Sequence, residues 1–161
     1  MLARKVENTM NRQLGIELAS AYAYLAMSAF CESRSLPGFA HWLRKQFDEE
    51  LEHAMKFFDF ICDRGGRVVL DSLDKPVQEF SSVLEVFEQA LDHERSVSRS
   101  IADVYGVAVS QKDYAAQAWL DWFATEQVEE EKSVGRIVDS LRRIGERGDA
   151  IYLLDKELAG R

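Results

Sequence analysis

Four long segments of this chain carry apolar residues at helical spacing, and each has a glutamate where the next apolar residue should stand. Steps of three and four residues keep side chains on one face of an α-helix. An ionised carboxylate in an apolar face is unfavourable unless something compensates it, so this pattern constrains the fold strongly. The first such series is Met10, Leu14, Glu17, Ala21, Tyr24 and Ser28.

The second segment begins at Pro37 and repeats the pattern with an additional imidazole. Glu50 stands in the series between Phe47 and Ala54, and His53 follows it by three residues. Residues three apart share a face of a helix, so Glu50 and His53 have the spacing of paired metal ligands. A single acidic run of this kind is more typical of a solvated helix face, and its partners elsewhere in the chain decide between the two interpretations.

The third and fourth segments supply those partners. Glu94 interrupts the apolar series of the third segment, which follows a capping-box pattern at Ser82. Glu126 and Glu130 interrupt the fourth, which is expected to begin with a second capping box at Ser110.

Two weaker elements complete the chain. Residues 66–80 show no periodicity, so we expect a connection, and fifteen extended residues at about 3.3 Å each could run the length of a helix. After Gly145 and Gly148, Asp149 is expected to cap a short fifth helix.

Counting from the turns places the four acidic positions at one level. At about 1.5 Å per residue, Glu17 and Glu50 differ in height by only about 5 Å in an antiparallel pair, and Glu94 and Glu130 flank their own turn similarly. We therefore predict an all-α fold: a four-helix bundle with a long crossover between helices 2 and 3 and a short fifth helix at the C-terminus.

Charge balance indicates what fills the centre of this bundle. Glu17, Glu50, Glu94 and Glu130 carry four negative charges, which two divalent cations would neutralise, and His53 adds a neutral nitrogen ligand. Oxygen-rich ligation with one imidazole suits iron or manganese, although zinc and copper would also bind.

Length and composition narrow the class of protein further. The 161 residues are predicted to form a single domain, 1–161, with the bundle at about 5–145 and the fifth helix at about 149–159. The formal charge of −8 argues against nucleic-acid binding. No stretch approaches the roughly 20 apolar residues of a membrane helix and no signal peptide is evident, so we expect no membrane association and a cytoplasmic location.

These residues together resemble the non-haem bacterial ferritins over essentially the whole chain, and the expected fold is thus ferritin-like. Ferritin-like di-metal bundles carry two Glu-x-x-His motifs. Here Glu50 and His53 form one, whereas Gln127 and Glu130 occupy the position of the second without a histidine. The resemblance therefore implies an asymmetric di-iron site, with two iron ions per subunit.

The resemblance also implies roles for individual residues. One iron would be bound by Glu17, Glu50 and His53, and the other by Glu50, Glu94 and Glu130, with Gln127 beside it. A possible third iron position would use Glu49, Glu126 and Glu129, which could instead be solvated acids on the inner surface of a shell.

Aromatic residues and histidines near the site are open to two interpretations. Tyr24 and Trp122 could supply electrons or hydrogen bonds, or could be core aromatic residues. His93 adjoins Glu94 but points about 100° away around the helix, which indicates a surface or interface position. Leu51 stands where bacterioferritins carry a haem-binding methionine, so no haem is expected.

By this resemblance the function is iron storage with ferroxidase activity: Fe(II) is oxidised by O2 or H2O2 and retained as ferric mineral. The apolar face of the fifth helix, formed by Ile151, Leu154 and Leu158, favours a homo-oligomer, by resemblance a hollow shell of 24 subunits. Two alternatives are a di-iron peroxide reductase of rubrerythrin type and a non-enzymatic, self-associating helical bundle.

Overall fold

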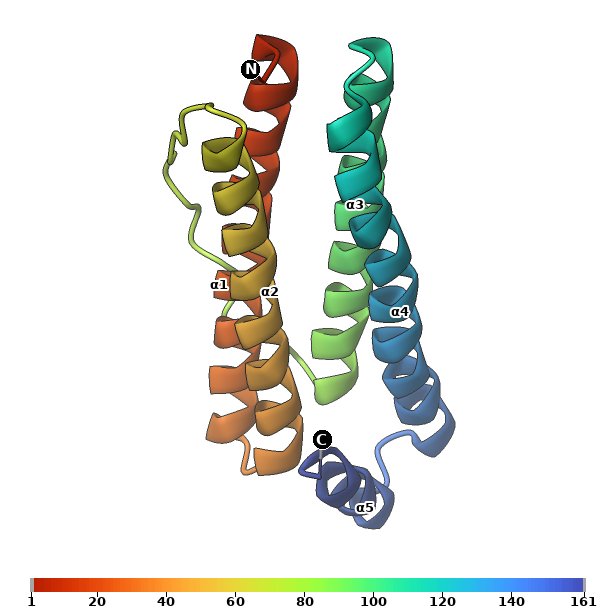
Figure 1. Cartoon of the computed structure of the whole chain (residues 1–161). Coiled ribbons are helices and arrows are strands. Elements are labelled where there is room, and N and C mark those ends of the chain that lie inside the picture. Colours follow the sequence, from red (N-terminus) through yellow and green to blue (C-terminus); the bar gives the residue numbers. More distant parts are fainter. Residues whose placement is uncertain (1, 161) are drawn as a thin grey trace.

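Five α-helices form the structure of residues 2–160, which a computed structural model describes (Figure 1). No strand occurs within this range, so the predicted all-α class is confirmed. The helices are α1 (Arg4–Ser33), α2 (Pro37–Asp63), α3 (Val83–Ser110), α4 (Tyr114–Ile144) and α5 (Gly148–Leu158).

Local sequence signals account for several helix ends. Pro37 is the first residue of α2, where its missing N–H removes no helical bond. The Ser82 hydroxyl accepts a hydrogen bond from the backbone N–H of Glu85 at 3.1 Å and caps α3. Gly65 and Gly145 follow α2 and α4 with φ of 70° and 60°, a region that favours glycine.

Two expected caps are wrong. Ser110 still belongs to α3, because its hydroxyl donates back to the carbonyl of Val107 at 2.8 Å, and α4 is capped instead by Asp113, whose carboxylate accepts from the N–H of Ala116 at 3.0 Å. Asp149 lies inside the first turn of α5, and the residue before that helix makes no side-chain cap.

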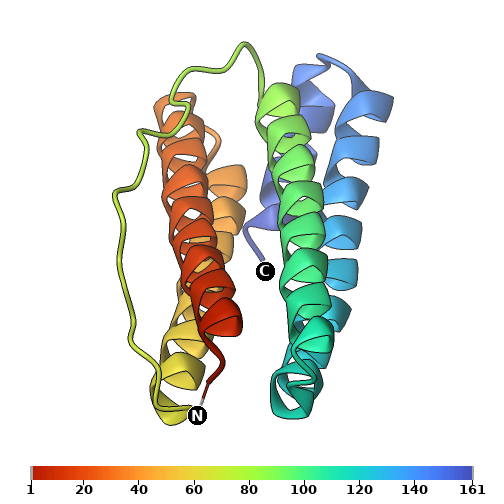
Figure 2. The same cartoon turned by 90° about the horizontal axis from the view of Figure 1, so that it is seen from above.

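The helices pack as two pairs. α1 packs along α2, α3 packs along α4, and α1 also contacts α3. The connection between α2 and α3 returns along the outside of α1, which leaves α2 and α3 running in the same direction (Figure 2). Asn11 holds this connection, because its amide donates to the carbonyl of Arg67 at 3.0 Å and accepts from the N–H of Val69 at 2.7 Å.

The apolar interior is divided into two clusters. One cluster lies toward α5 and includes Phe39, Phe87 and Leu141. The other lies toward the N-terminus and includes Met10 and Phe57. Between them is a layer of buried polar side chains, which is where the glutamates interrupt the apolar series.

The buried faces of α1 and α2 follow the predicted series closely, but those of α3 and α4 are rotated slightly. Steps of four and three residues from Glu94 lead to Ser98, Ile101 and Tyr105, yet Val97 and Val104 are the buried residues. On α4, Leu120 and Gln127 lie deeper than their neighbours Trp119 and Glu126. Steps of three and of four residues both stay near one face, so the periodicity does not fix the centre of the face to better than one residue.

By length and composition, α1 could cross a membrane, contrary to the expectation that no segment would qualify. Half of the apolar window of α1 is buried inside the bundle. Its buried residues include the polar side chains Gln13, Glu17 and Ser20.

Candidate metal centre

The polar layer brings together the five residues that the sequence placed at one level. Each is buried, with at most 4% of its surface exposed, and each of the four long helices contributes at least one. They are Glu17 on α1, Glu50 and His53 on α2, Glu94 on α3 and Glu130 on α4.

Glu17, Glu50 and His53 form the first group, in which one possible ligand atom from each residue lies within 4.8 Å of the others. His53 Nδ1 is 3.5 Å from Oε2 of Glu50. Both oxygens of Glu50 and Oε2 of Glu17 are buried without a hydrogen-bond partner in the described part of the chain. Burial, followed by the neighbouring carboxylates, raises the pKa of Glu17 and of Glu50 well above the usual range.

Glu94 accepts hydrogen bonds from two side chains. The Tyr24 hydroxyl donates to its Oε1, and the Gln127 amide donates to its Oε2 at 3.2 Å. Burial raises the pKa of Glu94, while these two hydrogen bonds act in the opposite direction. Burial also raises the pKa of Tyr24 well above 10, so the phenol keeps the proton with which it binds Glu94.

Glu130 faces both His53 and Glu126. One possible ligand atom from each of these three residues lies within 4.8 Å of the others. Burial, assisted by the charges of Glu94 and Glu49, raises the pKa of Glu130 to about 7.

The three acids expected at a third position differ in their surroundings. Glu126 is half-buried and joins the group of His53 and Glu130. Glu49 is half-buried, and its charge raises the pKa of both Glu50 and Glu130. Glu129 is exposed and pairs with Lys132 at 3.2 Å.

Aromatic rings cover one side of the layer. Trp122 lies edge-on to His53 with 5.5 Å between ring centroids, and Lys56 stands 4.6 Å above the Trp122 ring. Trp122 is 42% exposed, so it lies at the edge of the core.

His93 was expected at the surface or an interface, and it lies at the contact between α1 and α3. It is half-buried, and its Nε2 lies 2.5 Å from the hydroxyl of Ser20 across the α1–α3 contact. Burial lowers the pKa of His93.

Two buried glutamines escaped the sequence analysis. Gln13 donates to Oε1 of Glu17 at 2.8 Å, and Gln46 donates to Oε2 of Glu130 at 2.8 Å; neither glutamine side chain is exposed. Each glutamine precedes a predicted ligand, Glu17 or Glu50, by four residues, and this spacing is the signal that could have identified them.

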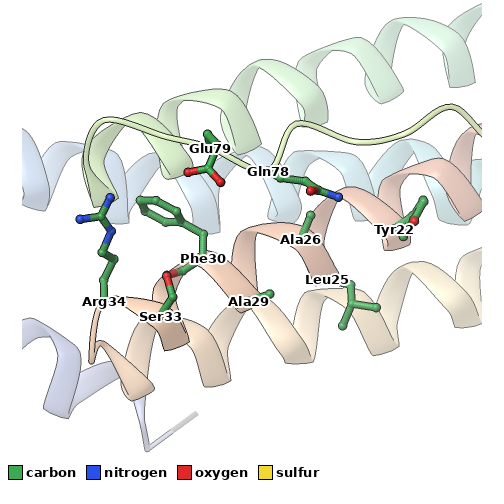
Figure 3. A pocket seen from close by; sticks show the side chains of 9 residues that line it. All are labelled: Tyr22, Leu25, Ala26, Ala29, Phe30, Ser33, Arg34, Gln78 and Glu79. Atoms are coloured by element: carbon green, nitrogen blue, oxygen red, sulfur yellow. The ribbon is translucent and has the colours of Figure 1, made fainter.

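One surface hollow of the molecule lies away from this layer. A hollow of about 620 Å³ lies between α1 and the end of the crossover connection, where Tyr22, Phe30, Gln78 and Glu79 line it (Figure 3). None of its lining residues belongs to the buried acidic layer.

With this geometry established, comparison with known proteins identifies the family. A family model described as the ferritin-like domain matches residues 7–144. This chain belongs to the ferritin family. A bacterial non-heme ferritin from Staphylococcus epidermidis is 41% identical over all of this chain and 97% of its own length. One from Bacteroides fragilis is 39% identical over the full length of both proteins.

Solved ferritin structures share the fold closely. An open-pore ferritin from the hyperthermophilic archaeon Archaeoglobus fulgidus superimposes with a TM-score of 0.99 at 44% sequence identity, covering all of this chain and 99% of that one. The ferritin-like bundle expected from the sequence is therefore confirmed.

Proposed function

We propose that this ferritin stores iron and has ferroxidase activity, oxidising Fe(II) to Fe(III) at a di-iron site inside each subunit. The observation that carries the proposal is Glu50, whose two buried oxygens lack hydrogen-bond partners among the described residues. An ionised carboxylate in such a place costs several kcal/mol unless a cation binds it. Two Fe(II) ions supply the charge that four glutamates require.

The assignment of the first ion follows the group of Glu17, Glu50 and His53. The assignment of the second rests on the buried acids around Glu94, whose charge raises the pKa of both Glu50 and Glu130. We assign one Fe(II) to Glu17, Glu50 and His53 and the other to Glu50, Glu94 and Glu130, with Glu50 bridging and Gln127 beside the second ion. The donor set is rich in oxygen and has one imidazole, which suits iron better than a thiolate-seeking metal.

For a third iron we propose Glu49, Glu126 and Glu129. The half-buried position of Glu126 beside His53 and Glu130 supports its part in this site. Glu129 would have to exchange its ion pair with Lys132 for the metal, so we expect the third site to be the weakest.

For this reaction the protein has to balance the charge of the cations, fix the positions of the ligands and release protons. Two Fe(II) ions bound side by side can each give one electron to O2 or H2O2. The carboxyls with raised pKa values release their protons as the cations bind. Tyr24 and Gln127 keep Glu94 oriented through their hydrogen bonds, and the apolar clusters above and below exclude bulk water.

Storage requires an enclosure. We propose that residues 1–161 form one ferritin-like domain and that this protein assembles as a homo-oligomer, a hollow cytoplasmic shell of 24 subunits that retains ferric mineral. The face of Ile151, Leu154 and Leu158, which was expected to contact another subunit, packs instead against the apolar cluster at that end of its own bundle. The exposed Tyr152 and Leu153 on the same helix support assembly, because apolar surface of this kind is suited to contact with another subunit.

The test is the oxidation of Fe(II) by the assembled protein, followed by absorbance and by the iron that stays with soluble protein. Glu50→Ala and Glu94→Ala should slow oxidation by about 100-fold or more, because each removes a ligand that sets the geometry. Glu52→Ala, on the exposed face of the same helix, is the matched control. Unchanged kinetics in both ligand variants would refute the assigned site.

Running the assay with O2 and with H2O2 separates the remaining possibilities. Rapid reduction of peroxide without retention of iron would favour a peroxide reductase. Absence of any Fe(II) binding in an anaerobic titration would favour a structural bundle.

A further inference from the structure

A chain of three polar side chains crosses the bundle from α3 to Glu17. The Ser100 hydroxyl donates to Oε1 of Gln13 at 2.5 Å, and Nε2 of Gln13 donates to Oε1 of Glu17 at 2.8 Å. Gln13 is fully buried and Glu17 is 1% exposed, so water does not compete for the bond between them. Ser100 is half-buried.

The hydrogen bond from Ser100 favours one orientation of the Gln13 amide. Only the carbonyl end of an amide can accept the proton of a hydroxyl group, so the NH2 end turns toward the carboxylate. Without Ser100 the carbonyl oxygen of Gln13 would lose this partner, and the orientation of the amide would depend on Glu17 alone.

Glu17 consequently has one oxygen at which no hydrogen bond competes with a cation. Its Oε1 is engaged by Gln13, whereas its Oε2 is buried and has no hydrogen-bond partner in the described part of the chain. Glu50 differs, because both of its oxygens are buried without such partners and can reach two cations.

We propose that Gln13 and Ser100 are positioning residues that make Glu17 a one-oxygen ligand of a divalent cation. The inference rests on the proposed di-metal function and adds to it a restriction on the coordination of the first ion. A carboxylate bound through one oxygen leaves a coordination position open, whereas one bound through both oxygens fills that position. An open position is what a reacting metal site needs for water or an oxidant.

The experiment is a titration of the assembled, iron-free protein with Co(II), a divalent probe whose visible absorption reports its coordination number. Gln13→Met keeps the length of the side chain and removes the amide. We expect it to weaken the binding of one of two Co(II) ions by about 10- to 100-fold, the usual effect of losing a group that orients a metal ligand. Its Co(II) absorption should also weaken, because Glu17 can then bind through both oxygens.

A matched series on α3 separates positioning from packing. Ser100→Ala should shift the affinity and the spectrum in the same direction as Gln13→Met, whereas Ser100→Thr retains the hydroxyl and should restore both. Ser96→Ala, at an exposed position of the same helix, should behave as the unmodified protein. Because Ser100 acts through Gln13, the double variant should match Gln13→Met alone.

Unchanged Co(II) affinity and absorption in Gln13→Met would overturn the inference, as would additive effects in the double variant. If Gln13→Met does not fold, identical Ser100→Ala and Ser100→Thr titrations overturn it. Failure of the proposed function has a different signature: Co(II) responses as predicted in protein that does not oxidise Fe(II).

Discussion

Tyr24 orients Glu94, one of the proposed metal ligands, through a single hydrogen bond. It lies 1% exposed on α1 and donates to a carboxylate on α3, so it connects two helices through the polar layer. We expect Tyr24→Phe to fold normally and to lower the affinity of the Glu94 side of the centre by about tenfold, because the carboxylate loses an orienting partner. Anaerobic titration with Fe(II) measures this. Tyr22→Phe, at a 42% exposed position of the same helix, is the control, and equal affinities in both variants would contradict the prediction.

The buried carboxyls also predict a pH dependence of stability for the metal-free protein. Burial raises the pKa of Glu130 from 4.5 to about 7 and raises that of Glu17, Glu50 and Glu94 in the same direction. Between about pH 4.5 and 7 the folded protein therefore holds protons that the unfolded chain has released, and the free energy of unfolding falls as the pH rises. For Glu130 alone the loss is on the order of 3 kcal/mol at most.

Denaturant unfolding at pH 5, 6, 7 and 8 in the presence of a chelator checks this. His93 acts in the opposite direction, because its lowered pKa makes the unfolded chain the better proton binder below pH 6.5, but it is one group against four. Glu130→Gln should flatten the curve, and a divalent cation should restore stability most at pH 8. A stability that rises steadily from pH 5 to 8 without metal would be inconsistent with buried, protonated carboxyls.

Most residues of the candidate centre could be predicted because each interrupts an apolar series on its own helix. Glu17, Glu50 and Glu94 needed only the periodicity and the distance from a turn. The bonds between helices could not be read in this way: the contacts of Gln46 with Glu130 and of His93 with Ser20 depend on the rotation and relative height of two helices to within one residue. Periodicity does not reach that accuracy.

At the scale of elements, the N-terminus of α2 depends on a segment that lies far away in the sequence. Leu36 provides no side-chain cap, and the carboxylate of Asp155 on α5 instead accepts hydrogen bonds from the backbone N–H groups of Gly38 and Phe39 at 2.8 and 2.9 Å. Helix α5 lies across that end of the bundle (Figure 1). The Ser82 cap of α3 and the start of α2 at Pro37 were predictable from neighbouring residues, whereas this long-range cap was not.

This contact makes Gly38 a critical residue. A Cβ atom on Gly38 would stand 1.7 Å from the carbonyl oxygen of Asp155, so α5 must move to accommodate it. We expect Gly38→Ala to destabilise the protein by about 1–3 kcal/mol, the usual cost of overpacking, as measured by thermal or denaturant unfolding. A Cβ on Gly15 meets nothing within 4 Å, so Gly15→Ala should stabilise α1 by about 0.5–1 kcal/mol. Equal stability of the two variants would argue against the docked position of α5.

At the scale of the whole molecule, the fold places a polar layer between two apolar clusters, so folding itself forms the site. The glutamates reduce the core that a bundle of this size could bury, and cation binding compensates for the reduction. The ferritin-like match covers residues 7–144, which include all four acidic positions, and the missing second histidine distinguishes this chain from di-metal bundles with two Glu-x-x-His motifs.

Assembly can be tested on α5 without touching the metal centre. Leu153 is 67% exposed, and we propose that it lies between subunits of the shell. Leu153→Glu should shift the protein from a large oligomer toward smaller species in size-exclusion chromatography with light scattering, because it places a charge in an apolar contact. Glu157→Ala, exposed on the same helix, should leave the mass unchanged. An intact large oligomer in Leu153→Glu would exclude this residue from the contact.

The most direct measurement is anomalous diffraction from crystals of this protein after a brief soak in Fe(II). We predict two strong iron peaks in each subunit at the centre of the bundle, one near Glu17 and His53 and one near Glu94 and Glu130, with Glu50 between them. A weaker third peak should lie beside Glu126. Iron found only on exposed acids, with no peak in the buried layer, would contradict the di-iron centre.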